Sequence, residues 1–350
     1  MFTPAYKITN KILTNIGKIE AAKATIENSP LIPAYEAKFR NEAVIRTVHH
    51  GTHIEGNALE QKEVEKVLAG QSVSARDRDV QEVLNYREVL KYIDSHKDEA
   101  ITEKILLEIH QVTTRKILKT ESSGRYRSVQ VRVTNSKTGE TSYTPPPPKQ
   151  ISPLVRDFLF WVDRVEPGEI HPVIKAAITH YVITAIHPFV DGNGRTARIL
   201  STLVLFKDDY DIKKLFSIEE YFDRDSRSYY LVLQKTSNQS KSIPERDLTA
   251  WIEYFTAGLA IELQRVKEKV QKLSVDIKMK GRLGQIPLNE RQLQLVEYMQ
   301  EYGQVSNKEW SYLLPMVSDD TILRDLRYLM RKGLVRKRGS TKSAVYLLKQ

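Results

Sequence analysis

Two strongly apolar helical segments, separated by a short polar loop, constrain the fold of this chain more than any other feature. Apolar residues recur at helical spacing over residues 174–186, and a second apolar helix is expected from about Thr196. Helices with so many apolar side chains belong in a protein core. Helix-period patterns also dominate residues 11–120. The chain is therefore predicted to be mainly α-helical.

Length, charge and cysteine content narrow the class of protein. At about 150 residues per domain, 350 residues suggest roughly two to three domains. The formal net charge of +10 makes nucleic acid or a phosphate-rich ligand a plausible partner. The absence of cysteine excludes disulfides, Cys-ligated zinc, iron–sulfur clusters and thiol catalysis. With no signal-peptide pattern and no run of 18 apolar residues, we expect a cytoplasmic protein that does not enter a membrane.

One segment has the pattern of a β-hairpin. Apolar and polar residues alternate between Tyr126 and Val133, and a turn sequence at Asn135–Gly139 precedes a second short run that ends at Tyr143. The four prolines at 145–148 predict an extended, non-helical spacer after the hairpin.

The loop between the two apolar helices has a composition suited to binding an anion. Residues 187–198 read His-Pro-Phe-Val-Asp-Gly-Asn-Gly-Arg-Thr-Ala-Arg. A helix that begins after Gly-Asn-Gly presents its first backbone N–H groups to the loop, and these donors and the helix dipole favour an anion. Gly192 and Gly194 let the backbone approach that anion closely. Arg195 and Arg198 share a helix face and can clamp further phosphates.

Two more residues of the loop supply reactive chemistry. Asp191 is a hard oxygen ligand suited to Mg²⁺ that also binds phosphate oxygens, and His187 is a base beside the phosphate site. Together they favour nucleotidyl transfer. The competing interpretation is an ordinary turn with His187 as a helix-end cap and surface arginines. This interpretation is disfavoured because so many reactive residues fall within residues 187–198. Two other phosphate-binding motifs, the P-loop and the dinucleotide-binding motif, are absent from the sequence.

These residues resemble the signature of the Fic family of AMP transferases, His-Pro-Phe-x-Asp-Gly-Asn-Gly-Arg-x-x-Arg, at every fixed position. The resemblance implies that His187 deprotonates a target hydroxyl, which attacks the α-phosphate of ATP. Asp191 then holds Mg²⁺, and Phe189 anchors the loop. The ATP-binding residues implied are Gly192, Asn193, Gly194, Arg195, Thr196, Ala197, Arg198, Tyr229 and Tyr230. Two tyrosines on a helix are, however, more often residues of ordinary core and surface packing.

The segment His49-His-Gly-Thr-His-Ile-Glu55-Gly resembles the inhibitory motif that many Fic proteins carry upstream of the domain. The resemblance implies that Glu55 pairs with Arg198 and blocks productive ATP binding. Gly51 departs from the motif, because Ser or Thr is expected at that position. A metal site formed by His49, His50 and His53 is disfavoured, since no carboxylate stands at a suitable spacing.

The last sixty or so residues are predicted to form a separate module. Helices are expected at residues 290–302, 307–313 and 318–332, followed by a β-ribbon up to Leu347. This order resembles a winged helix-turn-helix. Basic residues predominate between 324 and 342, so DNA binding through residues 318–346 is one hypothesis. Dimerisation or protein docking is the other, and a homodimer is compatible with it.

The predicted architecture is thus a Fic-type helical core with a β-hairpin flap, plus a small C-terminal winged-helix module. The predicted domains are residues 1–110 with the Glu55 segment, 111–285 as the catalytic domain, and 286–350. The predicted function is transfer of AMP from ATP to a Tyr, Thr or Ser hydroxyl of a target protein or of the chain itself. The alternatives are a nucleotide-sensing DNA-binding regulator, and a Fic enzyme that removes AMP or uses another phosphate donor.

Overall fold

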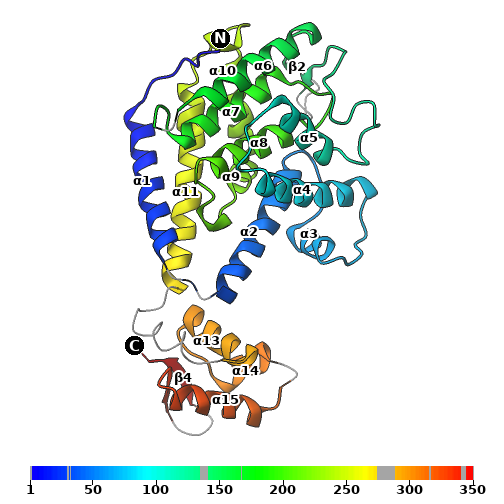
Figure 1. Cartoon of the computed structure of the whole chain (residues 1–350). Coiled ribbons are helices and arrows are strands. Elements are labelled where there is room, and N and C mark those ends of the chain that lie inside the picture. Colours follow the sequence, from blue (N-terminus) through cyan, green and yellow to red (C-terminus); the bar gives the residue numbers. More distant parts are fainter. Residues whose placement is uncertain are drawn as a thin grey trace. The chain divides into compact units, whose positions relative to one another are not determined.

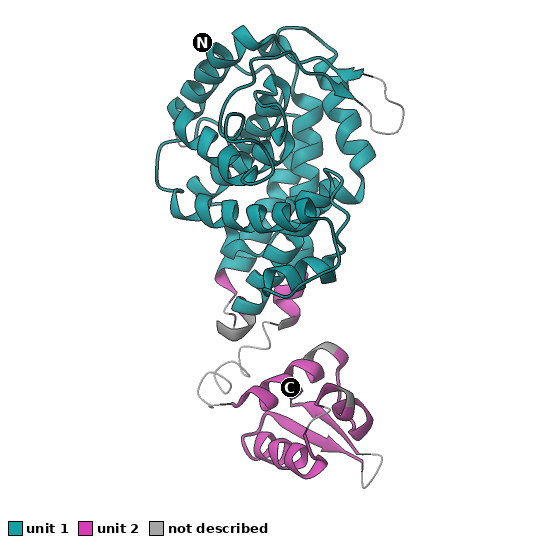
Figure 2. Cartoon of the chain, turned by 90° about the vertical axis from the view of Figure 1, so that its right-hand side faces the viewer, with its two compact units in different colours: residues 1–27, 37–266 teal, residues 28–36, 267–350 magenta. Residues whose placement is uncertain are grey.

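The computed structural model describes residues 2–29, 31, 33–134, 141–166, 168–273, 288–314, 317–339 and 344–349. The chain is mainly helical, as predicted (Figure 1). It divides into one compact unit of residues 1–27 and 37–266 and a second of residues 28–36 and 267–350 (Figure 2). The predicted boundary near residue 285 lies outside the described residues.

The first unit is built almost entirely from helices. Those before the hairpin are α1 (Asn10–Asn28), α2 (Pro33–His53), α3 (Gln61–Leu68), α4 (Asp77–Ser95) and α5 (Glu103–Thr113). Those after it are α6 (Pro148–Arg164), α7 (Pro172–Ile186), α8 (Asn193–Lys207), α9 (Ile218–Arg224), α10 (Ser226–Ser237) and α11 (Thr249–Leu273), with 3-10 turns at Ile212–Lys214 and Ile243–Glu245.

Helices α7 and α8 form the centre of this unit, as their apolar sequences predict (Figure 1). They pack against each other, α8 also contacts α4 and α5, and α7 also contacts α6. Trp251 of α11 is fully buried and donates a hydrogen bond to the carbonyl of Ala177 in α7, at 2.7 Å. Each buried Leu or Ile side chain of such a core stabilises the fold by about 1.5–3 kcal/mol. The loop between α7 and α8 is therefore anchored at both ends in a rigid core.

The ends of α7 and α8 set the shape of that loop. α7 stops at Ile186 because His187 adopts a left-handed conformation, with φ 51° and ψ 59°. Gly192 precedes α8 with φ 78°, and a Cβ there would lie 2.9 Å from a methyl carbon of Thr114. α8 begins at Asn193 rather than near Thr196 as predicted. Gly194 and Arg195 therefore belong to its first turn.

The hairpin is much shorter than its alternating pattern predicts. Its strands are β1 (Val133–Thr134) and β2 (Thr141–Tyr143), and the predicted turn at Asn135–Gly139 lies outside the described residues. Residues 126–132 are not a strand, because Arg127 ties that segment to the core. Its backbone N–H donates to Pro188, and its guanidinium donates to the carbonyls of His187, Val129 and Pro146.

The proline run is also less extended than predicted. Pro148 is the first residue of α6, whereas Pro147 before it has extended backbone angles. Proline is well tolerated at the first position of a helix, where its missing N–H would have no partner within the helix.

Gly51, the position that departs from the inhibitory motif, has a structural reason to be glycine. It lies in the last turns of α2, and a Cβ there would collide with the ring and hydroxyl of Tyr86. Tyr86 is fully buried on α4 and donates a hydrogen bond to Glu219 at 3.3 Å. The phenol thus fills the space that a Ser or Thr side chain at position 51 would need.

The second unit contains a small core of its own. Its elements from residue 290 onward are α13 (Glu290–Tyr302), α14 (Asn307–Leu313), α15 (Asp319–Arg331), β3 (Val335–Arg338) and β4 (Val345–Leu348). β3 and β4 are antiparallel, and Tyr346 of β4 also bridges to Val305. Trp310 and Leu326 are among the buried residues that join the helices to the strands. The order of elements is the predicted one, and assignment to the winged-helix class stays a prediction.

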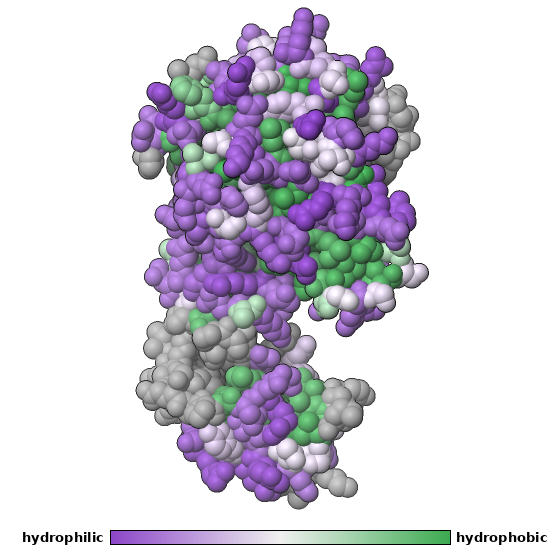
Figure 3. Space-filling view, turned by 45° about the vertical axis from the view of Figure 1, so that its right-hand side comes forward, coloured by the Kyte–Doolittle hydropathy of each residue, from purple (hydrophilic) through white to green (hydrophobic). Residues whose placement is uncertain are grey.

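Hydrophilic side chains predominate on the face shown in Figure 3, with smaller hydrophobic areas between them. Within the described residues, no helix has both the length and the apolar character needed to cross a membrane.

We predict that Gly51→Ala lowers the free energy of unfolding by roughly 1–3 kcal/mol, because the new methyl group would displace Tyr86. Gly17→Ala is the control: a Cβ at Gly17 in α1 meets nothing within 4 Å, so this change should stabilise by up to about 1 kcal/mol. Urea unfolding measures both. The steric explanation would be contradicted if the two substitutions changed the free energy of unfolding equally. It would also be contradicted if Gly51→Ala lowered the free energy of unfolding as much in a Tyr86→Ala background as in the wild type.

Candidate functional site

The loop between α7 and α8 is held from inside by its own residues. Phe189 is fully buried, and its ring stacks on His110 of α5 with centroids 3.7 Å apart. The side-chain amide of Asn193 brackets Phe189: it accepts from the Phe189 N–H and donates to the Phe189 carbonyl, both at 2.9 Å. Asn193 therefore shapes the loop with its side chain, which leaves its backbone N–H for an anion.

His187 stands at the start of the loop with one ring nitrogen engaged. Nδ1 lies 3.2 Å from the carbonyl of Thr184, and because a carbonyl only accepts, Nδ1 carries the proton. Nε2 then has the lone pair. Burial, aided by the charge of Arg127, lowers the pKa of His187 to about 4, against the opposing effects of Glu55 and Asp191. The imidazole is therefore neutral at pH 7, the form that a general base requires.

Asp191 presents a partly exposed carboxylate within the same loop. Oδ1 accepts from the N–H of Gly192 at 2.6 Å, and Oδ2 accepts from Arg78 of α4 at 2.9 Å. Although burial acts to raise its pKa, Arg195, the Gly192 N–H and Arg78 together hold it below the usual range. An ionised carboxylate with one oxygen bound only by a partly exposed arginine is a suitable ligand for Mg²⁺, which combines one or two carboxylates with phosphate oxygens and water.

A carboxylate from far away in the sequence lies against the first turn of α8. The N–H groups of Asn193, Gly194 and Arg195 precede the first helical bond, from Thr196 N–H to the Gly192 carbonyl. Glu55 lies in the turn directly after α2 rather than inside a helix, and a Cβ on Gly194 would collide with its Oε1. The same oxygen accepts a hydrogen bond from Arg198 Nη2 at 2.9 Å. The carboxylate thus sits where an anion is most favoured.

Arg195 and Arg198 do not form the exposed clamp that their spacing predicts. Both are buried, to 2% and 1% exposure, and each pairs with a different carboxylate. Arg195 contacts Glu82 of α4 at 3.1 Å, and Arg198 pairs with Glu55 and also donates to the Gly51 carbonyl at 2.9 Å. Within the described residues, Nε of Arg195 and both Nε and Nη1 of Arg198 have no hydrogen-bond partner, whereas Nη1 of Arg195 is the atom that contacts Glu82. Both arginines therefore keep donors for further acceptors.

The remaining predicted ATP-binding residues differ in position. Thr196 and Ala197 are fully buried in α8, and within the described residues the Thr196 hydroxyl has no hydrogen-bond partner. Tyr229 is also buried: its hydroxyl lies 3.1 Å from His180 Nε2, and burial raises its pKa to about 12 against the charge of Arg198. Tyr230 donates to the carbonyl of Ile54 at 3.1 Å, so it holds the turn that carries Glu55.

Two residues that sequence reasoning missed position the loop. His110 Nε2 donates to the Asp191 carbonyl at 3.0 Å, while its Nδ1 accepts from the Gly124 N–H at 2.9 Å. Burial lowers its pKa to about 4, which keeps this neutral tautomer. Arg127 donates from Nε to the His187 carbonyl at 2.9 Å. A single histidine in an apolar helix and an arginine in a strand-like run carry no sequence signal for these contacts.

Comparison of the sequence with known proteins found a matching family model and several relatives. Residues 100–205 match the model of the Fic/DOC family. The chain is similar to a protein adenylyltransferase Fic of Nematostella vectensis, 34% identical over 175 residues, which are 47% of this chain and 38% of that protein. The corresponding protein of Culex quinquefasciatus is 34% identical over 178 residues, 48% of this chain and 33% of the relative. The chain thus spans about a third of the length of these relatives.

Solved structures show the same fold. A Fic family protein from Desulfovibrio desulfuricans G20 superposes with a TM-score of 0.70 at 23% identity, covering 99% of this chain and 98% of that one. A Fic domain containing signaling protein from Bacteroides thetaiotaomicron gives 0.62 at 23% identity, covering 76% and 97%. Residues 100–205 therefore match the Fic/DOC family model, and the chain has the helical fold of these Fic proteins.

We predict that the His187 imidazole stays neutral from pH 8 to pH 5.5, because burial places its pKa near 4 rather than at the free value of about 6.5. Its ring resonances in ¹H–¹³C NMR, assigned by their loss in His187→Ala, should not move over this range. A titration midpoint between pH 6 and 7 would show that the ring is not desolvated.

Proposed function

We propose that this protein transfers AMP from ATP to a hydroxyl side chain of a target protein or of its own chain, and that Glu55 inhibits this transfer. One observation carries the proposal: the anion site at the first turn of α8 is occupied by a carboxylate of the same chain. The Fic/DOC match and the adenylyltransferase relatives indicate which anion belongs there. That anion is the triphosphate of ATP.

The residues of the loop fit the chemistry of this transfer. Nε2 of His187 takes the proton of the incoming hydroxyl, whose oxygen attacks the α-phosphorus of ATP. The new oxygen–phosphorus bond forms as the bond to pyrophosphate breaks, and pyrophosphate leaves in line. The first N–H groups of α8 and the charges of Arg195 and Arg198 match the negative charge of the phosphates.

Asp191 is the residue that would hold Mg²⁺. The ion would supply positive charge between the phosphates when bound, and Arg78, which now contacts Oδ2 of Asp191 at 2.9 Å, would give way to it. Arg78 is more than half exposed, so its guanidinium can move into solvent at little cost.

The hairpin is the element we propose to dock the target. A segment of the target would pair with the edge of β1 or β2 and bring its hydroxyl to His187. The hydroxyl of Tyr143 in β2 donates to the carbonyl of Ala185 at 2.7 Å, two residues before His187. The hairpin is thus connected to the residue it would serve.

Two alternatives remain compatible with the fold. A Fic enzyme that removes AMP or uses another phosphate donor would need the same loop. A nucleotide-sensing regulator would need no base, and the presence of His187 in the same loop as Asp191 favours an enzyme over it. A cytoplasmic location and a homodimer stay predictions.

We predict that Glu55→Gly raises the rate of AMP transfer about tenfold or more, the size of a typical coupling free energy of 1–3 kcal/mol. Removing the carboxylate frees Arg198 for the γ-phosphate, so ATP binds in a productive orientation. Incorporation of α-labelled ATP into the protein itself and into lysate proteins measures the rate, and mass spectrometry identifies the modified residue.

Two double variants serve as controls. Glu55→Gly with Arg198→Ala should lose the gain, and Glu55→Gly with His187→Ala should bind ATP yet transfer no AMP, since the base acts on the hydroxyl and not on the nucleotide. Folding is verified by circular dichroism. If Glu55→Gly is folded, binds ATP and is no more active than the wild type, Glu55 is not an inhibitor.

We also propose that the C-terminal unit binds nucleic acid through residues 318–346. Its supporting observation is that the basic side chains of α15, of the residue directly after it and of β3 are exposed: Arg324, Arg327, Arg331, Lys332, Arg336, Lys337 and Arg338. Between residues 324 and 338 the acidic residue is Asp325, which is buried and accepts from Arg291 at 2.9 Å and Gln292 at 2.8 Å. Asp319 and Asp320 in the first turn of α15 are exposed. The predicted contribution of Lys342 lies outside the described residues.

We predict that the full chain binds a 30-base-pair duplex with an affinity that falls steeply between about 50 and 200 mM salt. Arg324→Glu with Arg327→Glu should abolish the binding measured by fluorescence anisotropy. Lys7→Glu with Lys18→Glu, the same charge change on exposed residues of the other unit, should reduce it only slightly. Equal losses in the two variants, or no binding at the lowest salt, would contradict this proposal.

A further inference from the structure

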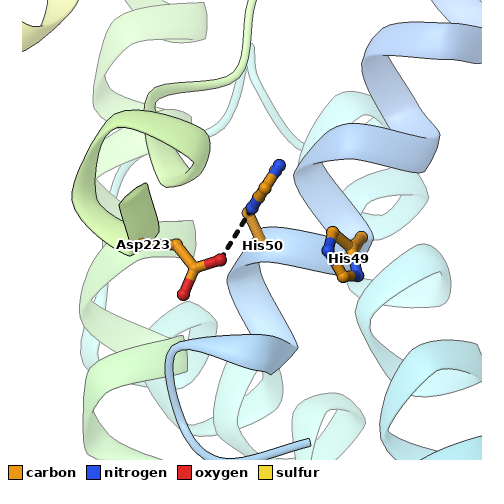
Figure 4. A group of neighbouring side chains, drawn as sticks. All are labelled: His49, His50 and Asp223. Carbon is orange, nitrogen blue, oxygen red and sulfur yellow. Dashed lines mark hydrogen bonds and ion pairs between the residues drawn. The ribbon is translucent and has the colours of Figure 1, made fainter. Parts of the chain in front are cut away.

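A histidine cluster stands beside the Glu55 turn and takes no part in the chemistry described above. His49 and His50 lie in the last turns of α2, and Asp223 lies in α9 (Figure 4). One donor atom from each of the three residues lies within 4.8 Å of the other two. His53, one turn after His49, also contacts Asp223. Segments about 170 residues apart in the sequence thus bring imidazoles and a carboxylate together.

The contacts within the cluster converge on the carboxylate. Asp223 Oδ2 lies 2.7 Å from Nδ1 of His50, and both oxygens lie 2.9 Å from Nδ1 of His53. The side chain of Asp223 is only 8% exposed. Burial acts to raise the pKa of this carboxyl, yet its two histidine partners hold it below the usual range. An ionised carboxylate flanked by imidazoles is a donor set for a divalent metal ion.

A separate observation also points to a ligand. His49 is 8% exposed, and within the described residues its buried Nδ1 has no hydrogen-bond partner. The ring packs against His50 and His53, with centroids 4.6 and 5.4 Å away. Buried polar atoms are usually satisfied by protein, water or an ion. A buried imidazole nitrogen without a partner, in a cluster of other imidazoles, is the arrangement expected of a metal-binding histidine when no ion is present.

We propose that His49, His50 and Asp223 bind a divalent transition-metal ion, with His53 available as a fourth ligand. Imidazole nitrogen with one carboxylate oxygen and no thiolate suits Zn²⁺ at four-coordination. At metal–ligand distances near 2.0–2.1 Å, tetrahedral donors lie about 3.3 Å apart, so small side-chain rotations suffice. The pair His49 and His53 also has the four-residue spacing that places two ligands on one helix face.

The site has a consequence for Glu55 that rests on the proposed function. His53 is the last residue of α2, and Glu55 follows it by two residues. Tyr230 already holds the intervening Ile54 through its carbonyl. A metal ion that joins the end of α2 to α9 would fix this turn more firmly, so it would favour the inhibited arrangement and lower the rate of AMP transfer.

Metal binding is tested on the full-length, untagged chain, stripped with a chelator and without nucleotide. Isothermal titration with Zn²⁺ should show one tight site per chain that a large excess of Mg²⁺ does not displace. X-ray absorption should show first-shell nitrogen and oxygen ligands with imidazole scattering. His49→Gln and Asp223→Asn should each weaken the binding by more than about tenfold, and His96→Gln, a histidine outside the cluster, should leave it unchanged.

Thermal unfolding separates a lost site from a lost fold. Zn²⁺ should raise the Tm of the wild type and of His96→Gln but not that of His49→Gln, whose Tm in chelator should match that of the wild type. No saturable site in the wild type, or equal Zn²⁺ binding by wild type, His49→Gln and Asp223→Asn, would overturn the proposal.

The link to Glu55 has its own readout. Zn²⁺ should lower AMP transfer by the wild type and leave Glu55→Gly unaffected. If Zn²⁺ binds but AMP transfer by the wild type is unchanged, the proposed link to Glu55 is overturned and the metal site is not. If Zn²⁺ lowers AMP transfer by both the wild type and Glu55→Gly, the inhibition acts at the active site and the link to Glu55 is overturned. Because titration and X-ray absorption use no nucleotide, a failure of the proposed function leaves the test of the metal site intact.

Discussion

The buried guanidinium of Arg198 is the constraint on which the rest of this site depends. Its side chain is fully enclosed at the start of the most buried helix pair, and a buried charge is tolerated only with a partner. In this structure the partner is Glu55, supported by the Gly51 carbonyl. The turn after α2 must therefore lie against α8, and Gly194 must lack a side chain to admit the carboxylate. The residues around it follow from that requirement: Tyr86 packs against Gly51, and Tyr230 holds the backbone at Ile54.

Local patterns were enough to predict the central part of the fold. The periodicity of residues 174–186 places α7 in the core because a helix with apolar side chains around it can only be buried. The Gly-Asn-Gly run marks the start of α8 to within a few residues, since Gly192 adopts the left-handed backbone that precedes the helix. The pairing of Glu55 with Arg198 was reached through the family resemblance, and no periodicity or spacing would have joined residues so far apart.

The contacts that the sequence could not predict are those made between distant segments. Alternation over residues 126–133 predicts a strand, but Arg127 donates four hydrogen bonds to backbone carbonyls, one from its backbone N–H and three from its guanidinium. These bonds hold residues 126–132 in a conformation that is not a strand. The histidines near residue 50 lacked a carboxylate at helical spacing, and the one they have, Asp223, comes from α9. Likewise the sequence predicts Arg195 to be an exposed phosphate ligand, whereas in the structure it is buried and contacts Glu82 of α4. Each of these contacts depends on tertiary packing, which local sequence propensity does not predict.

A carboxylate is a weaker match for this anion site than a phosphate, so its advantage has to come from the chain. Glu55 carries one charge on two oxygens, whereas the triphosphate carries several charges and can accept from more of the donors that α8, Arg195 and Arg198 present. Being tethered, however, Glu55 is present at an effective concentration set by the stiffness of its turn, and it has little ordering entropy left to lose. The strength of the inhibition is then decided less by the ion pair than by what holds residues 49–55 in place. In this chain that is the fit of Gly51 against Tyr86, the bond from Tyr230 to Ile54, and the histidine contacts with Asp223.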